Sequence, residues 1–227
     1  MGVHKRKWSL DMTQTIVIFM VGTILLNIIT REIVQLFVPD LVMPRDASFV
    51  NKIFMGLVLV EFLFALWKTP LTLNLYSLKI KKECNFKREM AEAGLISAAL
   101  ITGMVIYRLI MNGRNPEMAV RPVFGLYLNI HGRWFYPVSS VIQEFMIKGF
   151  LQDNLRSISK NQSRHVTILI NAMFFTILHM NYPFYYMICA GLLCLITGYL
   201  YERDGNIWGS VLIHFVIGFM PRALGLK

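Results

Sequence analysis

The run Thr13-Gln-Thr-Ile-Val-Ile-Phe-Met-Val-Gly-Thr-Ile-Leu-Leu-Asn-Ile-Ile29 decides the class of this protein. It contains no charged residue, and its apolar side chains form one long block rather than a stripe or an alternation. A helix needs about 20 mostly apolar residues to cross the roughly 30 Å hydrocarbon core of a bilayer, and shorter runs qualify when polar flanks reach the interface. Thr13–Ile29 is therefore predicted to be a membrane-spanning helix.

Further apolar stretches extend this prediction to about seven crossings, with a range of six to eight. The six others are Ile53–Trp67, Ala93–Met111, Phe135–Leu151, Val166–Met180, Phe184–Tyr201 and Ile207–Met220. Leu71–Ile80 is predicted to be an interfacial helix, and Val123–Ile130 to be a re-entrant segment or a split part of the fourth span. The predicted fold class is all-α, a polytopic helix bundle in a lipid bilayer.

The amino-acid composition excludes a soluble globular protein. Apolar residues make up 56% of the chain and charged residues only 16%, whereas soluble domains carry about 25% charged residues. A net charge of +10 would suggest nucleic acid as the partner of a soluble protein, but in a hydrophobic protein it reflects basic cytoplasmic loops. Nucleic acid is not a predicted partner.

The distribution of Lys and Arg predicts the orientation. With the N-terminus in the cytoplasm, Lys5–Lys7 and the basic stretch Lys79–Arg88 both lie inside, as the positive-inside rule requires. No internal repeat or Gly/Ser linker divides the chain, so we expect a single membrane domain. Within it, residues 1–134 carry the N-terminal helices and the basic cytoplasmic loop, and residues 135–220 carry the motifs described below.

Ionisable residues inside predicted spans mark candidate functional positions, because each costs about 2.5–3.5 kcal/mol at the bilayer centre on insertion scales. They are Glu61, Glu144, Lys148, His179 and His214. Glu61 is predicted to be a protonated or hydrogen-bonded carboxyl group with a structural role.

The remaining four have both structural and functional interpretations. Glu144 and Lys148 are four residues apart on one helical face, so they form either a self-neutralising ion pair, with Lys148 reaching toward the interface, or part of a site. A lone histidine in an apolar helix is usually a packed core residue. His179 and His214 lie on different spans from Glu144, however, and a bundle can bring all three together, so that a carboxylate accepts a proton and imidazoles hold a water or an oxyanion.

The order of the motifs resembles the CPBP family of intramembrane proteases, the CAAX proteases and Abi-like bacteriocin-processing or immunity proteins. The family pattern is E-E-x-x-x-R, then F-x-x-x-H, then H-x-x-x-N. It corresponds here to Gln143-Glu144-Phe-Met-Ile-Lys148, to Phe175-Thr-Ile-Leu-His179, and to His214-Phe-Val-Ile-Gly218. The resemblance implies catalytic roles for Glu144, His179 and His214, with Gln143, Lys148, Phe175 and Gly218 at supporting or substituted positions.

Three substitutions separate the chain from the family pattern. Gln143 replaces the glutamate that activates water in the family, and a neutral amide cannot accept that proton. Lys148 keeps the positive charge of the expected Arg but not its bidentate geometry. Gly218 removes the Asn that helps bind the oxyanion. Together they predict reduced or lost activity unless Glu144 acts as the base.

Three functions remain open. The first is an intramembrane endopeptidase acting on a peptide or a membrane-anchored protein. The second is an inactive member of the same fold that serves as a bacteriocin-immunity or regulatory binding protein. The third, a small transporter, is less favoured because the inverted repeat typical of transporters is not found. The resemblance leaves a divalent metal such as zinc open as a cofactor, with no metal ligands assigned, and favours a bacterial cytoplasmic membrane as the location.

Overall fold

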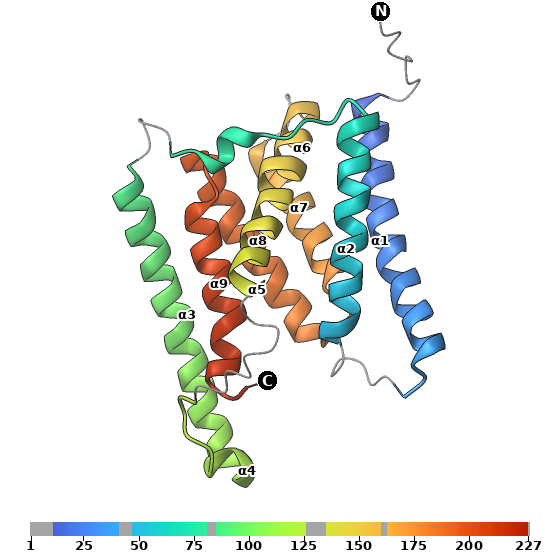
Figure 1. Ribbon diagram of the computed structural model, residues 1–227. Helices are drawn as coiled ribbons and strands as arrows, with labels where there is room; N and C mark the ends of the chain where they lie inside the picture. The colour runs from blue at the N-terminus through green and yellow to red at the C-terminus, as the bar shows by residue number, and fades with distance from the viewer. Residues whose placement is uncertain (1–10, 41–46, 81–84, 126–134, 160–162, 227) are drawn as a thin grey trace, which may run out of the picture. The chain divides into compact units, whose positions relative to one another are not determined.

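The computed structural model describes residues 11–40, 47–80, 85–125, 135–159 and 163–226, and the regular structure in these ranges is all helical (Figure 1). The elements are α1 (Met12–Phe37), α2 (Ala47–Lys68), a 3₁₀ turn (Leu75–Leu78), α3 (Phe86–Arg114), α4 (Pro116–Ala119), α5 (Phe135–Glu144), a π-helical segment (Phe145–Gln152), α6 (Asp153–Ile158), α7 (Arg164–Leu178), α8 (Phe184–Asp204) and α9 (Trp208–Ala223). The predicted all-α class is confirmed.

Among the residues that the structure describes, four helices are long and apolar enough to cross a membrane by length and composition, namely α1, the Phe49–Lys68 part of α2, α3 and α8. α7 and α9 are apolar but have only 15 and 16 residues, which is about 22–24 Å at 1.5 Å per residue. Within the described ranges each of the seven predicted runs coincides with a helical stretch. The number of crossings stays a prediction.

The chain divides into two compact units. Met1–Asn74 and Phe150–Ile196 form the first unit, and Leu75–Gly149 and Thr197–Lys227 form the second. The boundary therefore falls inside the π-helical segment and inside α8. The boundary predicted between residues 134 and 135 was placed where the motif-bearing part of the chain begins, and not from packing between helices. It stays a prediction.

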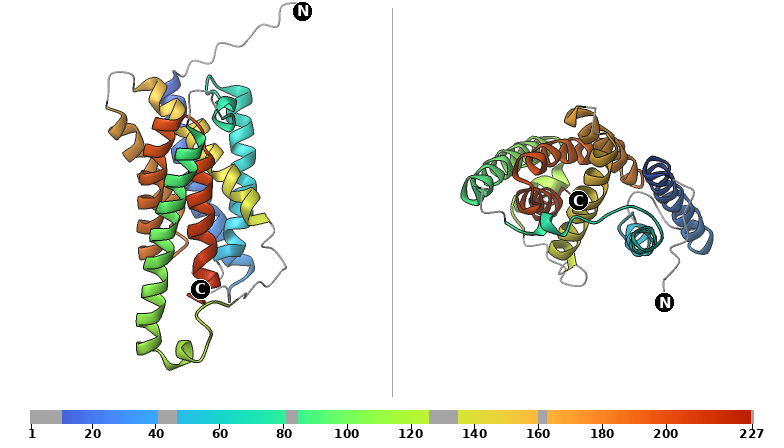
Figure 2. Two further views of the ribbon diagram at one scale, coloured as in Figure 1. Left: turned by 90° about the vertical axis from the view of Figure 1, so that its left-hand side faces the viewer. Right: turned by 90° about the horizontal axis from the view of Figure 1, so that it is seen from above.

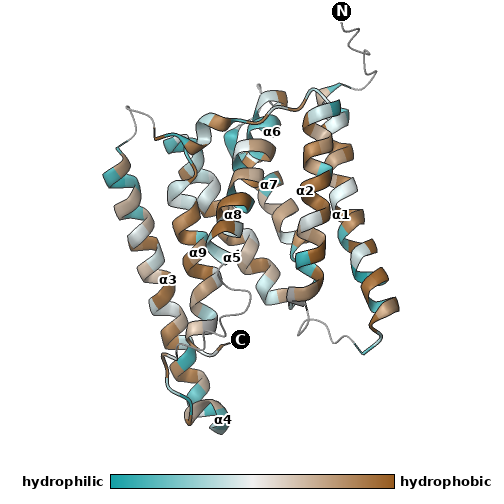
Figure 3. Ribbon diagram, viewed as in Figure 1, coloured by the Kyte–Doolittle hydropathy of each residue, from teal (hydrophilic) through white to brown (hydrophobic). Residues whose placement is uncertain are grey.

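In the first unit, α1 has an inverted distribution of polar and apolar side chains. Its buried polar residues are Thr15, Thr23, Asn27 and Thr30. Its exposed apolar residues include Val17, Ile18, Val21, Leu25, Ile29 and Ile33. This pattern is typical of a helix whose outer face contacts lipid while its polar groups find partners on other helices, and Figure 3 shows the hydrophobic colour along much of α1 and α2.

Phe150 forms the centre of the core in the first unit. Its ring is fully buried and makes edge contacts with Phe19 of α1, at 5.1 Å between ring centroids, and with Phe62 of α2, at 4.8 Å. Edge-to-face packing of this kind is favourable for aromatic rings. A residue of the π-helical segment is thereby joined to the two N-terminal helices, which pack against each other.

In the second unit, α3 and α9 lie side by side, as Figure 2 shows, and α5 packs on α9. Arg108 of α3 is fully buried near the end of this helix pair. Its guanidinium donates to the carbonyl oxygens of Leu224, at 2.7 Å, and Met118, at 2.8 Å. Carbonyl groups beyond the end of α9 and in α4 are thus satisfied by one side chain.

The interfacial helix predicted over Leu71–Ile80 is wrong, because only the single 3₁₀ turn Leu75–Leu78 is helical. Asn154 takes both backbone groups of Thr72, accepting from its N–H at 3.0 Å and donating to its carbonyl oxygen at 2.7 Å. A side chain that satisfies both backbone groups offers an alternative to helical hydrogen bonds. Val123–Ile130 lies outside the described residues from position 126 onward, as do Lys5–Lys7 and the centre of the basic stretch Lys79–Arg88.

Candidate functional site

Glu144 and His214 form a buried pair in the second unit. Nδ1 of His214 lies 2.7 Å from Oε1 of Glu144, and the two residues are 6% and 3% exposed, respectively. An ionised carboxylate only accepts hydrogen bonds, so Nδ1 carries the hydrogen when Glu144 is charged. The predicted convergence of these two residues is therefore present in the structure.

The other oxygen of Glu144 differs from the first. Among the described residues, Oε2 is buried and accepts no hydrogen bond. Buried polar atoms in proteins are nearly all hydrogen-bonded, so a buried oxygen without a donor calls for a water, an ion or a ligand as the explanation. This oxygen is the atom of the pair that remains available for chemistry.

Lys148 lies one turn beyond Glu144, in the π-helical segment. It is 0% exposed, so the prediction that it reaches toward the membrane interface is wrong. Its ammonium group instead acts electrostatically on the Glu144 carboxylate. π-helical turns are rare and occur frequently at functional sites, because they shift the side chains that follow relative to an α-helix.

Gly149 permits the close approach of the 3₁₀ turn to the π-helical segment. A Cβ at this position would lie 2.6 Å from Oγ of Ser77. The carbonyl oxygen of Ser77 accepts from the Ile207 N–H at 3.0 Å, and that of Leu78 accepts from Nε1 of Trp208 at 3.1 Å. The turn therefore contacts both the segment that carries Lys148 and the start of the helix that carries His214.

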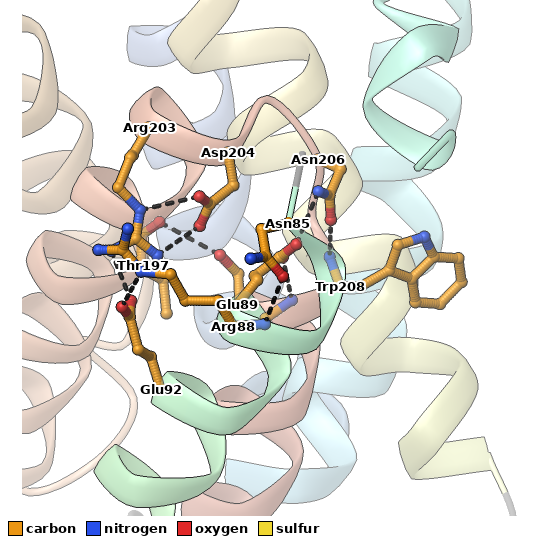
Figure 4. Close-up of polar contacts among 11 residues, drawn as sticks. Asn85, Arg88, Glu89, Glu92, Thr197, Arg203, Asp204, Asn206 and Trp208 are labelled. Atoms are coloured by element: carbon orange, nitrogen blue, oxygen red, sulfur yellow. Dashed lines mark hydrogen bonds and ion pairs between the residues drawn. The ribbon is translucent and has the colours of Figure 1, made fainter. Parts of the chain in front are cut away.

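Glu89 anchors the N-terminus of α9 (Figure 4). The residue is 2% exposed, and its carboxylate accepts from the Gly209 N–H at 2.9 Å and from Nδ2 of Asn206 at 2.8 Å. Asn206 in turn accepts from the Trp208 N–H at 3.0 Å. A carboxylate at this end of a helix satisfies unpaired N–H groups and complements the helix dipole.

The turn before α9 depends on Gly205, which has a φ of 68°. This left-handed conformation is easily adopted by glycine and costs other residues free energy. It connects Asp204, the last residue of α8, to Asn206 at the anchor. Glu89, Gly205 and Asn206 together set the position of α9, and hence of His214.

Tyr136 of α5 lies against Gly218 of α9, the position where the family pattern has Asn. A Cβ built on Gly218 would lie 1.4 Å from the Tyr136 hydroxyl oxygen. The same hydroxyl donates to the carbonyl oxygen of His214 at 3.4 Å. The glycine is therefore required by the tyrosine, and no larger residue fits at 218 while Tyr136 is in place.

His179 and Phe175 belong to the first unit. His179 ends α7, its Nδ1 lies 2.9 Å from the Phe175 carbonyl oxygen, and the two rings are 4.5 Å apart. The F-x-x-x-H spacing thus gives a local contact across one helical turn. Tyr182 and Tyr186 lie next to the imidazole, with ring centroids 5.9 and 6.4 Å away.

Three asparagines fix the turn that follows His179. Nδ2 of Asn181 donates to Oδ1 of Asn27, at 2.6 Å, and to Oδ1 of Asn51, at 3.2 Å. Nδ2 of Asn27 donates to the Leu178 carbonyl oxygen at 3.0 Å. α1 and α2 therefore hold the C-terminal end of α7, where His179 lies, through the buried amide of Asn27 and the half-buried amide of Asn51.

The motif residues are distributed over both units. Glu144, Lys148, His214, Gly218 and the half-buried Gln143 lie in the second unit, and Phe175 and His179 lie in the first. The structure brings Glu144 and His214 into contact with each other. The participation of His179 remains a prediction from the motif.

Glu61 has a partner on a neighbouring helix, as its structural interpretation predicted. Thr23 of α1 donates to its Oε2 at 2.9 Å, and a Cβ on Gly22 would lie 2.7 Å from its Oε1. The carboxyl group of α2 is therefore packed against α1 at a glycine.

Glu89 and Tyr136, which position or contact the site, are not among the residues predicted from the sequence. The hydrogen bond between Asn206 and Glu89 joins positions 117 residues apart. Tyr136, at the start of a predicted span, is indistinguishable from an ordinary interfacial aromatic residue. Residue spacing alone contains no signal for either contact.

A catalytic zinc site uses three protein ligands and a water. Within the described ranges, no group of three or more His, Cys, Asp or Glu side chains is arranged to hold a metal ion. The facing atoms of Glu144 and His214 are also bonded to each other. A divalent metal stays a prediction from the family resemblance, and the chemistry proposed below uses the side chains alone.

Residues 129–220 match the family model of the Rce1-like proteins, described as type II CAAX prenyl endopeptidase Rce1-like. The range includes every motif residue from Gln143 to Gly218, so the resemblance to the CPBP family is confirmed. No curated protein and no solved structure matches the chain. With its long apolar helices, the chain is an integral membrane protein, and its residues 129–220 are similar to the Rce1-like family.

Proposed function

We propose that the chain is an intramembrane endopeptidase of CPBP type, in which Glu144 is the general base, and that it acts on a peptide or a membrane-anchored protein. The observation that carries this proposal is the state of the Glu144 carboxylate. One oxygen is held by His214, and the other is buried and accepts no hydrogen bond from the described residues. A carboxylate oriented in this way is suited to bind and deprotonate a water.

The reaction follows from this geometry. Oε2 of Glu144 accepts a proton from water as the water oxygen attacks the peptide carbonyl carbon. The protonated carboxyl group then gives that proton to the leaving amine. His214 keeps the carboxylate in one orientation, and the Lys148 ammonium offsets its negative charge.

Gln143 supports the assignment of this role to Glu144. Its amide is neutral and cannot act as a base, and general acid–base catalysis contributes about 10²–10⁴-fold to a rate. Glu144 is the acidic residue of the first motif, so hydrolysis depends on it. His179 is proposed to hold water or the oxyanion, as the motif implies.

A second candidate is an inactive protein that binds a bacteriocin, a peptide or a regulatory membrane protein. The observation that favours it is Gln143 itself, because the position of the family's base carries an amide. A binding protein needs the polar site but not a proton acceptor. The two candidates therefore differ in what the Gln143→Glu variant does.

The test is quantitative mass spectrometry of new peptide termini in membranes from cells that produce the full chain. Termini present with the wild type, absent with Glu144→Gln and retained with Glu61→Gln would support an endopeptidase that depends on Glu144. Glu61→Gln is the matched control, because it makes the same change on α2. Termini that appear only with Gln143→Glu would contradict the proposal and favour the binding protein.

The location in a bacterial cytoplasmic membrane, with the N-terminus inside, is also proposed. It is supported by the excess of Lys and Arg in the loops assigned to the cytoplasm and by the family resemblance. A periplasmic reporter enzyme fused before Met1 should be inactive, while the same reporter fused after α1 should be active. The reverse result would overturn the orientation.

A further inference from the structure

The 3₁₀ turn Leu75–Leu78 is fixed at the end of the second unit where α3 begins. The carbonyl oxygen of Leu78 accepts from Nε1 of Trp208, at the start of α9, at 3.1 Å. The next residue of α9, Gly209, donates its N–H to Glu89 in the first turn of α3 (Figure 4). Because α3 is long and apolar enough to cross a membrane, its first turn is expected at a surface of the bilayer. The 3₁₀ turn is therefore positioned at the level of that surface.

The turn has a buried side and an exposed side. Ser77 is fully buried, and its carbonyl oxygen accepts from the Ile207 N–H at 3.0 Å. Leu75, Tyr76 and Ile80 are each more than half exposed. Backbone hydrogen bonds thus hold the turn to the unit while these three side chains stay exposed. Exposed apolar groups at a bilayer surface are suited to the boundary between headgroups and acyl chains.

Lys79 adds a positive charge beside these apolar side chains. It is exposed, and its Nζ lies 4.9 Å from the centroid of the Tyr76 ring. Lysine side chains lay their methylene groups along apolar surface and keep the ammonium group in the polar layer. Tyrosine rings are enriched at the same depth of a membrane. The two side chains together are suited to the headgroup layer.

Positive charge continues from the turn into α3. The stretch Lys79–Arg88 has basic residues at positions 79, 81, 82, 87 and 88 and one acidic residue, Glu83. Lys87, in the first turn of α3, is exposed. Within the part of the chain that the structure describes, neither Lys79 nor Lys87 forms an ion pair. Both ammonium groups are thus available to a negatively charged partner.

Three acidic side chains at this end of the unit are engaged with other groups. Glu89 is 2% exposed and is held against the start of α9. Glu92 forms ion pairs with Arg88 and Arg203, and Asp204 pairs with Arg203. These charges offset one another, so the exposed lysines set the sign of the surface.

We propose that the 3₁₀ turn, Lys79, Ile80 and the first turn of α3 form a binding surface for anionic lipid headgroups. The apolar side chains of the turn enter the boundary of the acyl chains, and Lys79 and Lys87 contact the phosphate groups. A membrane surface attracts nearby Lys and Arg when its lipids carry a net negative charge. The partner is therefore a phospholipid with a net negative headgroup, such as phosphatidylglycerol, in the bilayer that surrounds the chain.

The experiment titrates the purified full chain in a non-ionic detergent with phosphatidylglycerol or phosphatidylcholine of the same acyl chains, and follows the melting temperature. A ligand that binds the folded state raises this temperature, so phosphatidylglycerol should raise it more than phosphatidylcholine. Loss of one lysine weakens attraction to an anionic surface about fivefold. Lys79→Gln and Lys87→Gln should each raise the half-saturating concentration of phosphatidylglycerol by about that factor. Lys52→Gln, the same change at an exposed position of α2, is the matched control and should leave it unchanged.

Leu75→Ser tests the apolar part of the surface. Because this side chain is exposed, the melting temperature without lipid should stay close to that of the wild type. The half-saturating concentration of phosphatidylglycerol should rise, because less apolar surface enters the lipid. Leu36→Ser, at an exposed position near the end of α1, is the matched control and should keep the wild-type concentration.

Three results would overturn the proposal. One is an equal rise of the melting temperature with phosphatidylglycerol and phosphatidylcholine in the wild type. Another is a wild-type half-saturating concentration in both lysine variants. The third is a rise of the same size with inorganic phosphate, because a small anion would then be sufficient and the surface would not select a lipid. The measurement involves no peptide cleavage, so its failure would leave the proposed endopeptidase function untouched.

Discussion

Nδ1 of His214 lies 2.7 Å from Oε1 of Glu144, although the two residues are 70 positions apart in the sequence. Both side chains are buried, and Lys148 acts on the same carboxylate from one turn away. Such a pair is sensitive to the loss of any one member, because removing a partner leaves a desolvated group without compensation.

His214→Ala is expected to lower the free energy of unfolding in detergent by about 1–3 kcal/mol, the cost of leaving a buried acceptor without its donor. The measurement is denaturant-induced unfolding of the purified chain. His165→Ala, at an exposed position near the start of α7, should change stability by no more than about 0.5 kcal/mol. Equal effects of the two substitutions would contradict the buried pair.

Lys148→Met is expected to destabilise the chain by about 3–5 kcal/mol, because it removes a buried positive charge that offsets the Glu144 carboxylate. Combining it with Glu144→Gln should recover much of this loss, since the uncompensated negative charge is then also removed. The measurement is a double-mutant cycle in detergent unfolding. Strictly additive effects would show that Lys148 and Glu144 do not interact.

Glu89→Ala is expected to destabilise the chain by about 1–3 kcal/mol, because the Gly209 N–H and the Asn206 amide lose a buried acceptor. It should also slow the appearance of new termini, because α9 carries His214. Glu92→Ala is the matched control one turn further along α3. Glu92 forms surface ion pairs with Arg88 and Arg203, and such pairs are worth about 0–1 kcal/mol.

A larger loss from Glu92→Ala than from Glu89→Ala would contradict this account of the anchor. Figure 4 shows why the two should differ, since the Glu89 carboxylate faces the turn before α9 while the Glu92 carboxylate meets the two guanidinium groups.

Gly191→Ala is expected to destabilise the first unit by about 1–3 kcal/mol through overpacking, because its Cβ would lie 2.1 Å from Oγ1 of Thr176 on α7. Thr176→Ala removes that oxygen, so Gly191→Ala should cost much less in the Thr176→Ala background. Heating in detergent followed by size-exclusion chromatography measures both. An equal cost in the two backgrounds would show that Thr176 is not the obstacle.

The class of the protein and the approximate positions of its helices could be predicted from the amino-acid sequence. An uninterrupted apolar run such as Thr13–Ile29 satisfies its own backbone hydrogen bonds as a helix and has no other favourable state in lipid. The spacing of local motifs was also readable, as with Phe175 and His179, whose contact lies within one helical turn. Glu144 and His214 could be proposed as partners because an ionisable side chain without a partner costs free energy inside an apolar span.

Contacts between distant segments, by contrast, became known only from the folded structure. Asn154 holds Thr72 in a non-helical conformation, where apolar composition predicted a helix. The 3.6-residue periodicity of the sequence likewise predicted neither the π-helical segment nor the burial of Lys148. Gly218 was interpreted as the loss of a donor, whereas the structure shows that the Tyr136 hydroxyl fills the same volume. Each of these features depends on packing between segments distant in sequence, and residue spacing within one segment contains no information about which distant side chain will occupy a given space.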